Sequence, residues 1–410
     1  MNSNISQNFH LVCVASDFKG NPFIEAAKRR GAYVTLVTKN KHASDAWTRG
    51  AIDNFVTIGD NSTPDDYLRT VAWIARQRAV HHVVGLDEFD VLPTAQIREF
   101  LQINRGLRVS EAVLFRDKLA MRFVAERARI PQPEFVPLFN LAEVAEYQER
   151  TAAPWIMKPR TEVSAFGLRK IEAPAQIWEN IHELDARNKW RDHSSQFLIE
   201  KFVPGKVFHV DSLVWNNQPV FAGVSSYGTP PMTVTHQGGV FTTSTLDYHT
   251  VERQALIELN RHLIEAFGIK QGVTHAEFLQ SNETGEFFLL EVAARVGGAY
   301  IADALAAATN VNLWAEWANV ELSDAANPYQ LPETRQDHAG VVLSLANQET
   351  PDTSAYTETE IVYRIERPRH VGFVVRSNEH ARVQDLLQQY STRFIQDFTI
   401  AAPSREPHDL

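Results

Sequence analysis

The first third of the sequence alternates between short apolar runs and stretches with helical periodicity. The apolar runs predict strands and the intervening stretches predict helices; in chain order they are 9–14, 22–30, 33–37, 65–78 and 82–86. Strand–helix–strand alternation is typical of a parallel sheet with crossover helices, and it predicts an α/β fold. Ser16 to Gly20 stand where a GxGxxG loop would follow the first strand. This departure disfavours a nicotinamide-binding Rossmann domain and an oxidoreductase function.

Length and charge narrow the class of protein further. The chain has 410 residues, enough for two or three domains, and a net charge of −10. Such an acidic chain lacks the basic surface that nucleic-acid binding needs. The single cysteine, Cys13, excludes an internal disulfide, and no apolar run reaches the ~20 residues of a membrane helix. Residues 1–7 are polar and do not resemble a signal peptide. We therefore expect a cytoplasmic enzyme with no membrane or nucleic-acid partner.

Two composition changes suggest where the domains end. Boundaries are expected near residue 110 and near residue 330, where Pro328 and Pro332 stand among polar residues. Between them, helices are predicted after Asp117, over 250–267 before Gly268, and over 300–322 as one continuous element. Strands are predicted over 155–157, 168–171, 197–202, 207–214, 219–225, 273–280 and 287–292.

The last two of these strands flank a polar turn, residues 281–286, and predict a β-hairpin. Pairing that is symmetric about Thr284 places Glu277 directly opposite Glu291. The same face then carries His275, Ala293 and Arg295, and the other face carries core residues, namely Ala276, Phe278, Phe288, Leu290 and Val292. Two opposed carboxylates repel each other unless a cation lies between them, and oxygen ligands suit Mg²⁺ with a phosphorylated ligand. A solvated acidic face without metal is the alternative, and spacing alone does not decide between them.

Two lysines and a strand end are candidate nucleotide contacts. Lys118 opens the helix after Asp117, and Lys158 ends a strand before the small-residue loop 164–167. Lysines placed in this way can neutralise phosphates, with backbone N–H groups of the loop assisting. Taken alone, each lysine is more often a solvated surface charge. The apolar strand 197–202 leads into a Pro-Gly turn, and its end offers a backbone edge and apolar walls to an adenine ring.

Taken in order, these segments resemble one known family. The ordered set is Asp117-Lys118, Lys158-Pro159, Glu200-Lys201-Phe202-Val203-Pro204-Gly205, His209-Val210-Asp211, Glu277 and the run from Glu291 through Arg295 to Gly297-Gly298. The chain resembles the ATP-grasp carboxylate–amine ligases over roughly residues 10–375. It looks most like the stand-alone L-amino-acid ligases, which form dipeptides, and less like the biotin-carboxylase and purine-biosynthetic members.

The resemblance implies an ATP-grasp fold preceded by a Rossmann-like pre-ATP-grasp domain. The implied division is 1–110 for the N-terminal domain, 111–330 for the ATP-grasp domain with a lid at about 150–205, and 331–410 for a C-terminal α/β subdomain. It also implies a reaction in which a carboxylate, such as that of an amino acid, is activated by ATP and Mg²⁺ (Mn²⁺ is the other candidate) as an acyl-phosphate. An amine then displaces phosphate. A homodimer is a further expectation, because dimers are common in the family.

The resemblance assigns a role to each matching residue. Lys118, Lys158 and the loop residue Ser164 would contact ATP phosphates, and Glu200, Lys201, Phe202 and Val203 would form the adenine hinge. Glu277 and Glu291 would hold Mg²⁺. Arg295 would stabilise the acyl-phosphate and the tetrahedral intermediate, and Gly297 and Gly298 would let backbone N–H groups approach the substrate carboxylate.

Two positions depart from the family pattern. Val207 stands where many members carry an acidic ribose ligand, and Ala293 stands where an asparagine metal ligand is common. The L-amino-acid ligases share the alanine. Two further residues have open roles: His236 would contact a phosphate or substrate or be solvated, and Glu88 would capture a substrate amino group or be a turn carboxylate. The alternatives for function are a carboxylase or carboxyphosphate-type ATP-grasp enzyme and a catalytically silent nucleotide-binding protein.

Overall fold

Three β-sheets organise the chain in the computed structural model, which describes residues 9–163, 166–229 and 239–398. The N-terminal sheet has four parallel strands in the order β3-β2-β1-β4. Its elements are β1 (His10–Ala15), α1 (Asn21–Arg29), β2 (Tyr33–Lys39), η1 (Asn40–His42), η2 (Arg49–Ala51), β3 (Asn54–Ile58), α2 (Pro64–Gln77), β4 (His82–Gly85), η3 (Glu88–Asp90), α3 (Val91–Phe100), α4 (Val109–Ala112) and η4 (Val113–Phe115).

Helices cover both faces of this sheet, as expected for parallel strands with continuous apolar runs. Leu11 and Cys13 of β1 pack in one cluster with α1, whereas Val12 and Val14 pack in another with α2 and α3. The predicted parallel α/β unit is confirmed.

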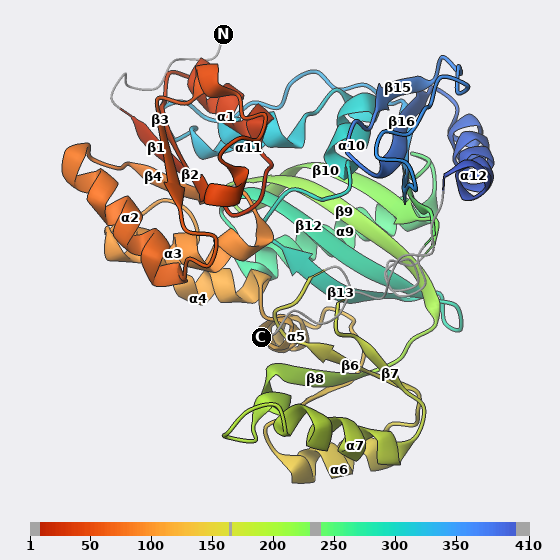
Figure 1. Ribbon diagram of the computed structural model, residues 1–410. Helices are drawn as coiled ribbons and strands as arrows, with labels where there is room; N and C mark the ends of the chain where they lie inside the picture. Colours follow the sequence, from red (N-terminus) through yellow and green to blue (C-terminus); the bar gives the residue numbers. More distant parts are fainter. Residues whose placement is uncertain (1–8, 164–165, 230–238, 399–410) are drawn as a thin grey trace.

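A second sheet of four strands forms a separate lobe, at the bottom of Figure 1. Its order is β5-β8-β6-β7, and α6 and α7 cover one of its faces with the apolar cluster that includes Val144, Tyr147 and Ile181. The elements are β5 (Phe135–Pro137), α6 (Leu141–Arg150), β6 (Trp155–Pro159), β7 (Arg169–Ile171), α7 (Pro174–Asp185), η5 (His193–Gln196) and β8 (Phe197–Lys201). We call this lobe the lid sheet.

The third sheet has eight strands in the order β13-β12-β9-β10-β11-β14-β16-β15, all antiparallel. Strands from the region after residue 330 therefore extend the same sheet as the hairpin strands. The elements are α5 (Lys118–Ala128), β9 (Gly205–Trp215), β10 (Gln218–Tyr227), β11 (Phe241–Thr245), α9 (Val251–Phe267), β12 (Gln271–Ser281), β13 (Phe287–Ala293), α10 (Ile301–Thr309), α11 (Leu313–Glu321), β14 (His338–Leu345), β15 (Ile361–Arg364), β16 (His370–Ser377) and α12 (His380–Asp397). No helix in the described ranges is long and apolar enough to cross a membrane.

Local sequence signals explain several of the helix ends. The Asp117 side chain accepts a hydrogen bond from the Leu119 N–H at the start of α5, and Gly268 ends α9 with φ 72°. The predicted single helix over 300–322 is wrong, because the chain forms α10 and α11 instead. Asn310 adopts φ 66° and ends α10, and the Asn312 side chain caps α11 by accepting from the Ala315 N–H.

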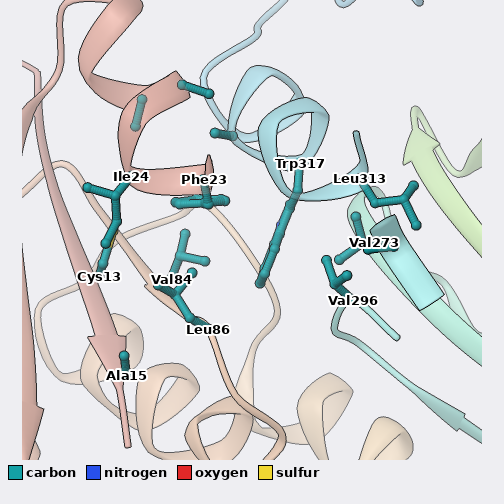
Figure 2. Close-up of a cluster of buried hydrophobic side chains, with 14 of the residues drawn as sticks. Cys13, Ala15, Phe23, Ile24, Val84, Leu86, Val273, Val296, Leu313 and Trp317 are labelled. Carbon is teal, nitrogen blue, oxygen red and sulfur yellow. The ribbon is translucent and has the colours of Figure 1, made fainter. Parts of the chain in front are cut away.

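One hydrophobic cluster joins the N-terminal sheet to the large sheet. It runs from Cys13 and Phe23 through α11 to Val273 and Val296 (Figure 2). The Phe23 and Trp317 rings meet at 4.9 Å between centroids. Because this core is continuous, residues at the ends of the N-terminal strands hold a fixed position relative to the β12–β13 hairpin.

Removing the largest side chain of this junction should destabilise the protein. We expect Trp317→Ala to lower the free energy of unfolding by about 3–5 kcal/mol, since Trp317 is 4% exposed and its loss leaves a cavity. Urea unfolding followed by circular dichroism measures the change. Trp190→Ala is the control, because Trp190 is 75% exposed, and it should change stability by at most about 0.5 kcal/mol. Equal effects of the two substitutions would contradict the shared core.

Candidate active site

A cavity of about 530 Å³ lies between the lid sheet and the large sheet. Side chains of β6 and β8 border it on one side, and side chains of β10, β12 and β13 border it on the other. Most of the predicted site residues line it, namely Lys118, Lys158, Glu200, Lys201, Phe202, Val203, Glu277, Glu291, Arg295 and Gly298. Glu88 and Gly297 are not among its lining residues, and Ser164 and His236 lie outside the described residues.

The hairpin places the two glutamates face to face, as predicted. β12 and β13 pair Glu277 with Glu291 and His275 with Ala293. Beyond Glu277 the register shifts, so Phe278 pairs with Leu289 rather than with Leu290. Leu289 is fully buried in the core, whereas Leu290 lines the cavity. The prediction that Leu290 shares the face of Ala276, Phe278 and Val292 is therefore wrong. A β-bulge turns Leu290 to the cavity face, where it packs, partly buried, against another apolar cluster.

Lys118 neutralises one of the opposed carboxylates. Its Nζ lies 3.0 Å from Glu291 Oε2 and donates to the Glu162 carbonyl at 2.6 Å. Burial would raise the pKa of Glu291, but the positive charges of Lys118, Lys158 and Arg295 lower it to about 2. Glu291 is therefore ionised at neutral pH. Lys118, a predicted phosphate ligand, and Glu291, a predicted metal ligand, therefore neutralise each other's charge.

Lys158 is held in a second buried pair. Its Nζ lies 2.7 Å from Glu200 Oε2, and Arg122 Nε donates to Glu200 Oε1 at 2.6 Å. Burial, together with the neighbouring Arg122 charge, lowers the pKa of Lys158 to about 8 despite the Glu200 carboxylate. Both Glu200 oxygens are engaged in these contacts. The side chain of Glu200 thus orients Lys158. The backbone groups that follow Glu200 are the ones that remain to hydrogen-bond an adenine ring.

The end of the cavity near β8 is apolar. Ile156, Leu168 and Leu279 line it together with Phe202 and Val203. Within the described part of the chain, the Val203 N–H donates to no other backbone group. Gly205 allows β9 to approach β12 here, since a Cβ at this position would lie 2.1 Å from the Gln280 carbonyl oxygen. Apolar walls beside the Val203 N–H suit a flat ring with one polar edge. Val207 also lines the cavity and brings no hydrogen-bonding group to it.

Arg295 is held from the N-terminal sheet. Its Nε donates to Glu88 Oε2 at 2.6 Å, and Arg116 Nη1 donates to Glu88 Oε1 at 2.6 Å. Arg116 also donates to the Thr161 carbonyl next to the lid sheet. Glu88 is 8% exposed and both of its oxygens contact guanidinium groups. These contacts favour a role for Glu88 in positioning Arg295, and capture of a substrate amino group stays a prediction.

A buried hydrogen-bond network supports Glu277. The Tyr227 hydroxyl donates to Glu277 Oε1 at 2.7 Å. His275 Nε2 lies 3.4 Å from the same oxygen, and His275 Nδ1 lies 2.8 Å from Asp211 Oδ1. Burial would lower the pKa of His275, but the Asp211 carboxylate raises it to about 9. Gly297 gives room for this pair, because a Cβ there would lie 2.5 Å from Asp211 Oδ1. This packing explains the glycine at 297.

Sequence reasoning missed several residues of the site. Arg122 and Arg116 were not singled out, and neither was the partner of Glu277, Tyr227. Arg122 follows Lys118 by four residues and so shares its helix face, which is a signal that could have found it. Tyr227 ends β10 and Arg116 precedes α5, and no local pattern in the sequence marks either of them.

Two parts of the chain match models of known protein families. Residues 151–303 match the model of the ATP-grasp domain, and residues 24–103 match that of the ATP-grasp N-terminal domain. The chain therefore contains an ATP-grasp domain and an ATP-grasp N-terminal domain. The predicted fold class, an ATP-grasp fold preceded by a Rossmann-like domain, is confirmed.

Two curated relatives are ligases by name. The chain is 24% identical over 242 residues to an L-arginine-specific L-amino acid ligase of Bacillus subtilis, a match that covers 59% of this chain and 57% of the relative. It is 26% identical over 195 residues to D-alanine–D-alanine ligase B of Pseudomonas putida, covering 46% of this chain and 57% of the relative. The matches thus span less than two thirds of the length of either relative.

Two solved structures share the fold over nearly the whole chain. An L-amino acid ligase from Bacillus licheniformis superposes with a TM-score of 0.73 at 17% identity, covering 97% of this chain and 100% of that one. An N5-carboxyaminoimidazole synthetase from Staphylococcus aureus complexed with ADP superposes with a TM-score of 0.72 at 13% identity, covering 96% and 98%. At these identities the likeness concerns the fold.

The pKa of Lys158 leads to a pH dependence of nucleotide binding. The ammonium form attracts phosphate, and with a pKa of about 8 it is lost as the pH rises above 8 in the free protein. We expect the Kd for MgADP to increase between pH 8 and 9.5, by at most about tenfold per pH unit. Calorimetry from pH 7.5 upward measures this, since nucleotide phosphates stay ionised there. Lys158→Arg stays charged and should give a shallower profile that retains only the change due to His275, whose pKa is about 9. Identical profiles for the wild type and Lys158→Arg would contradict the assignment.

Proposed function

We propose that this protein is an ATP- and Mg²⁺-dependent ligase that joins a carboxylate to an amine through an acyl-phosphate, releasing ADP and phosphate. The observation that carries the proposal is the cavity itself. It brings together two opposed carboxylates, two lysines and an arginine between two sheets. The two ligases among the relatives support the same class of reaction.

ATP would lie along the cavity with its base at the apolar end. The backbone between Lys201 and Val203 would read the adenine edge, with Ile156 and Leu279 against the ring faces. The phosphates would then reach Lys118 and Lys158. Lys118 would exchange Glu291 for a phosphate oxygen, and Lys158 would contact a phosphate oxygen while Glu200 orients it. The expected phosphate contact of Ser164 lies outside the described residues.

The donor set fits a divalent cation. Glu277 and Glu291 face each other on one side of the hairpin, and carboxylate oxygens are the ligands that Mg²⁺ prefers. The cation, when bound, neutralises phosphate charge during phosphoryl transfer. Lys118 and Tyr227 contact these carboxylates, and both side chains would have to yield to a bound cation. Mn²⁺ would fit the same oxygens.

The substrates would meet near Arg295. A substrate carboxylate oxygen attacks the γ-phosphorus, the bond to the β-phosphate oxygen breaks, and ADP leaves. The amine nitrogen then attacks the acyl carbon, phosphate leaves, and the amine loses a proton. Arg295 would stabilise the negative charge that develops in both steps, with the Gly298 N–H beside it. No protein nucleophile is required.

An amino acid is the expected carboxylate substrate, and an amide or dipeptide the expected product. The support for this finer assignment is the L-amino acid ligase among the relatives. The alternative substrate is bicarbonate, which would accept the γ-phosphate in place of an amino-acid carboxylate. It is considered because an N5-carboxyaminoimidazole synthetase shares the fold. A substrate panel distinguishes the two.

Phosphate release from ATP and Mg²⁺ tests the proposal. We expect turnover with particular pairs of L-amino acids, little with either partner alone, and none with bicarbonate plus an amine. Glu291→Gln should lower turnover at least about a hundredfold, because it removes a charge that the cation needs. Glu283→Gln is the matched control on the same hairpin, since Glu283 is exposed in the turn, and it should retain activity.

Three results would contradict the proposal. They are formation of AMP instead of ADP, bicarbonate-dependent turnover, and unchanged turnover of Glu291→Gln. Intact ADP binding with no turnover on any pair would favour a catalytically silent nucleotide-binding protein.

A further inference from the structure

The carboxylate face of the β12–β13 hairpin also carries an imidazole. His275 pairs directly with Ala293, two residues along each strand from the Glu277–Glu291 pair. Directly opposed side chains share a face of the sheet, and so do residues two apart. The face therefore presents two carboxylates, one imidazole and one methyl group. The Ala293 side chain has no atom that can bind a metal ion. In the His275–Ala293 pair, a side-chain metal ligand can therefore come only from His275.

The imidazole is fixed in one orientation. His275 is 4% exposed and its Nδ1 lies 2.8 Å from Asp211 Oδ1 on the neighbouring strand β9. Asp211 is fully buried, and the absence of a side chain at Gly297 leaves room for the contact. Nδ1 is thus committed to Asp211. Nε2 is the remaining nitrogen, and His275 borders the cavity.

The other imidazole of this cluster has no nitrogen to spare. His209 Nδ1 lies 2.6 Å from Asp211 Oδ2, and its Nε2 lies 2.8 Å from Thr243 Oγ1. Asp211 therefore has a histidine on each oxygen. The three residues His209, Asp211 and His275 form an orienting network rather than a metal site of their own. His275 Nε2 is the atom that the network leaves for the cavity.

The distance from His275 Nε2 to Glu277 suits a cation shared by these two residues. Glu291 would have to turn toward them, because within the described residues the ligand atoms of all three do not lie within 4.8 Å of one another. His275 Nε2 lies 3.4 Å from Glu277 Oε1. Two ligands at right angles on an octahedral cation, each at about 2.1 Å from it, lie about 3 Å apart. A histidine that ligates a metal usually donates its other N–H to a carboxylate, which is the arrangement of His275 and Asp211.

We propose that His275 Nε2 is a third protein ligand of the divalent cation held by Glu277 and Glu291, with Asp211 as its orienting partner. The inference rests on the proposed function, which supplies the cation. Coordination replaces the contact between Nε2 and Glu277, and the proton on Nε2 leaves to solvent as the cation binds. Imidazole nitrogen binds transition-metal ions better than it binds Mg²⁺. The site should therefore bind Mn²⁺ more tightly than Mg²⁺, and His275 should be the cause of that preference.

Pulsed electron paramagnetic resonance of the Mn²⁺–ADP complex tests the ligand directly. The full chain is used, prepared once with natural nitrogen and once with ¹⁵N-histidine. We expect electron spin echo modulation from a directly bound ¹⁴N that changes to ¹⁵N modulation on labelling. His275→Ala should abolish it, whereas His209→Asn, which alters the other imidazole on Asp211, should retain it.

Metal affinity provides a second readout and a rescue. We expect His275→Ala to weaken Mn²⁺ binding about tenfold to a hundredfold, measured by calorimetry with ADP present. The double variant His275→Ala with Ala293→Asn places an oxygen donor on the opposite strand. It should recover Mg²⁺ binding without the histidine modulation and should lose the preference for Mn²⁺. Thermal unfolding confirms that each variant is folded.

The outcomes separate this inference from the proposed function. Mn²⁺ that binds to the wild type and is lost in Glu291→Gln, but shows no histidine modulation, would overturn the role of His275 and leave the proposed function standing. Modulation that persists in His275→Ala would also overturn it. A wild-type protein that binds no Mn²⁺ with ADP would overturn both.

Discussion

Two carboxylates that face each other across a hairpin need positive charge between or beside them, and the rest of the site follows from this constraint. The pairing of β12 with β13 fixes the backbones of Glu277 and Glu291, so their Cβ atoms cannot move apart without breaking the sheet. Lys118 supplies one positive charge at 3.0 Å from Glu291, and Tyr227 supplies a hydroxyl hydrogen to Glu277. A bound cation would replace both contacts at the carboxylates, and Lys118 would then contact a phosphate.

The N-terminal sheet takes part in this arrangement although it lies outside the cavity. The cluster around Phe23 and Trp317 joins it to the large sheet, and Glu88 at the carboxyl end of β4 reaches Arg295 and Arg116. Arg116 in turn contacts the Thr161 carbonyl beside the lid sheet. One carboxylate thus connects all three sheets at the point where the substrates would meet. Charges in such a network are worth more than exposed ion pairs, because little water screens them.

The confirmed predictions are ones that rest on local sequence patterns. The strand period of two and the turn at 281–286 were enough to pair Glu277 with Glu291, and Asp117 and Gly268 marked helix ends correctly. The bulge that turns Leu290 toward the cavity was not predicted, because a single extra residue in a strand leaves no pattern. The left-handed Asn310 that divides α10 from α11 was also missed.

Contacts between distant segments could not be read from the sequence. The pairs Lys118–Glu291 and Arg295–Glu88 join residues that are 173 and 207 positions apart, and only the assembled sheets bring them together. For the same reason the engagement of Glu200 by Lys158 and Arg122 was not foreseen. The family pattern supplied the order of these residues, and the structure supplied their partners.

Transfer of the γ-phosphate to a substrate carboxylate is the central claim, and oxygen labelling tests it most directly. A carboxylate substrate that carries ¹⁸O in both oxygens is incubated with ATP, Mg²⁺ and the amine, and the released phosphate is analysed by ³¹P NMR. The acyl-phosphate route predicts one ¹⁸O in each phosphate formed, since the bridging oxygen leaves with phosphorus. Phosphate without ¹⁸O, or label found in AMP, would contradict the account.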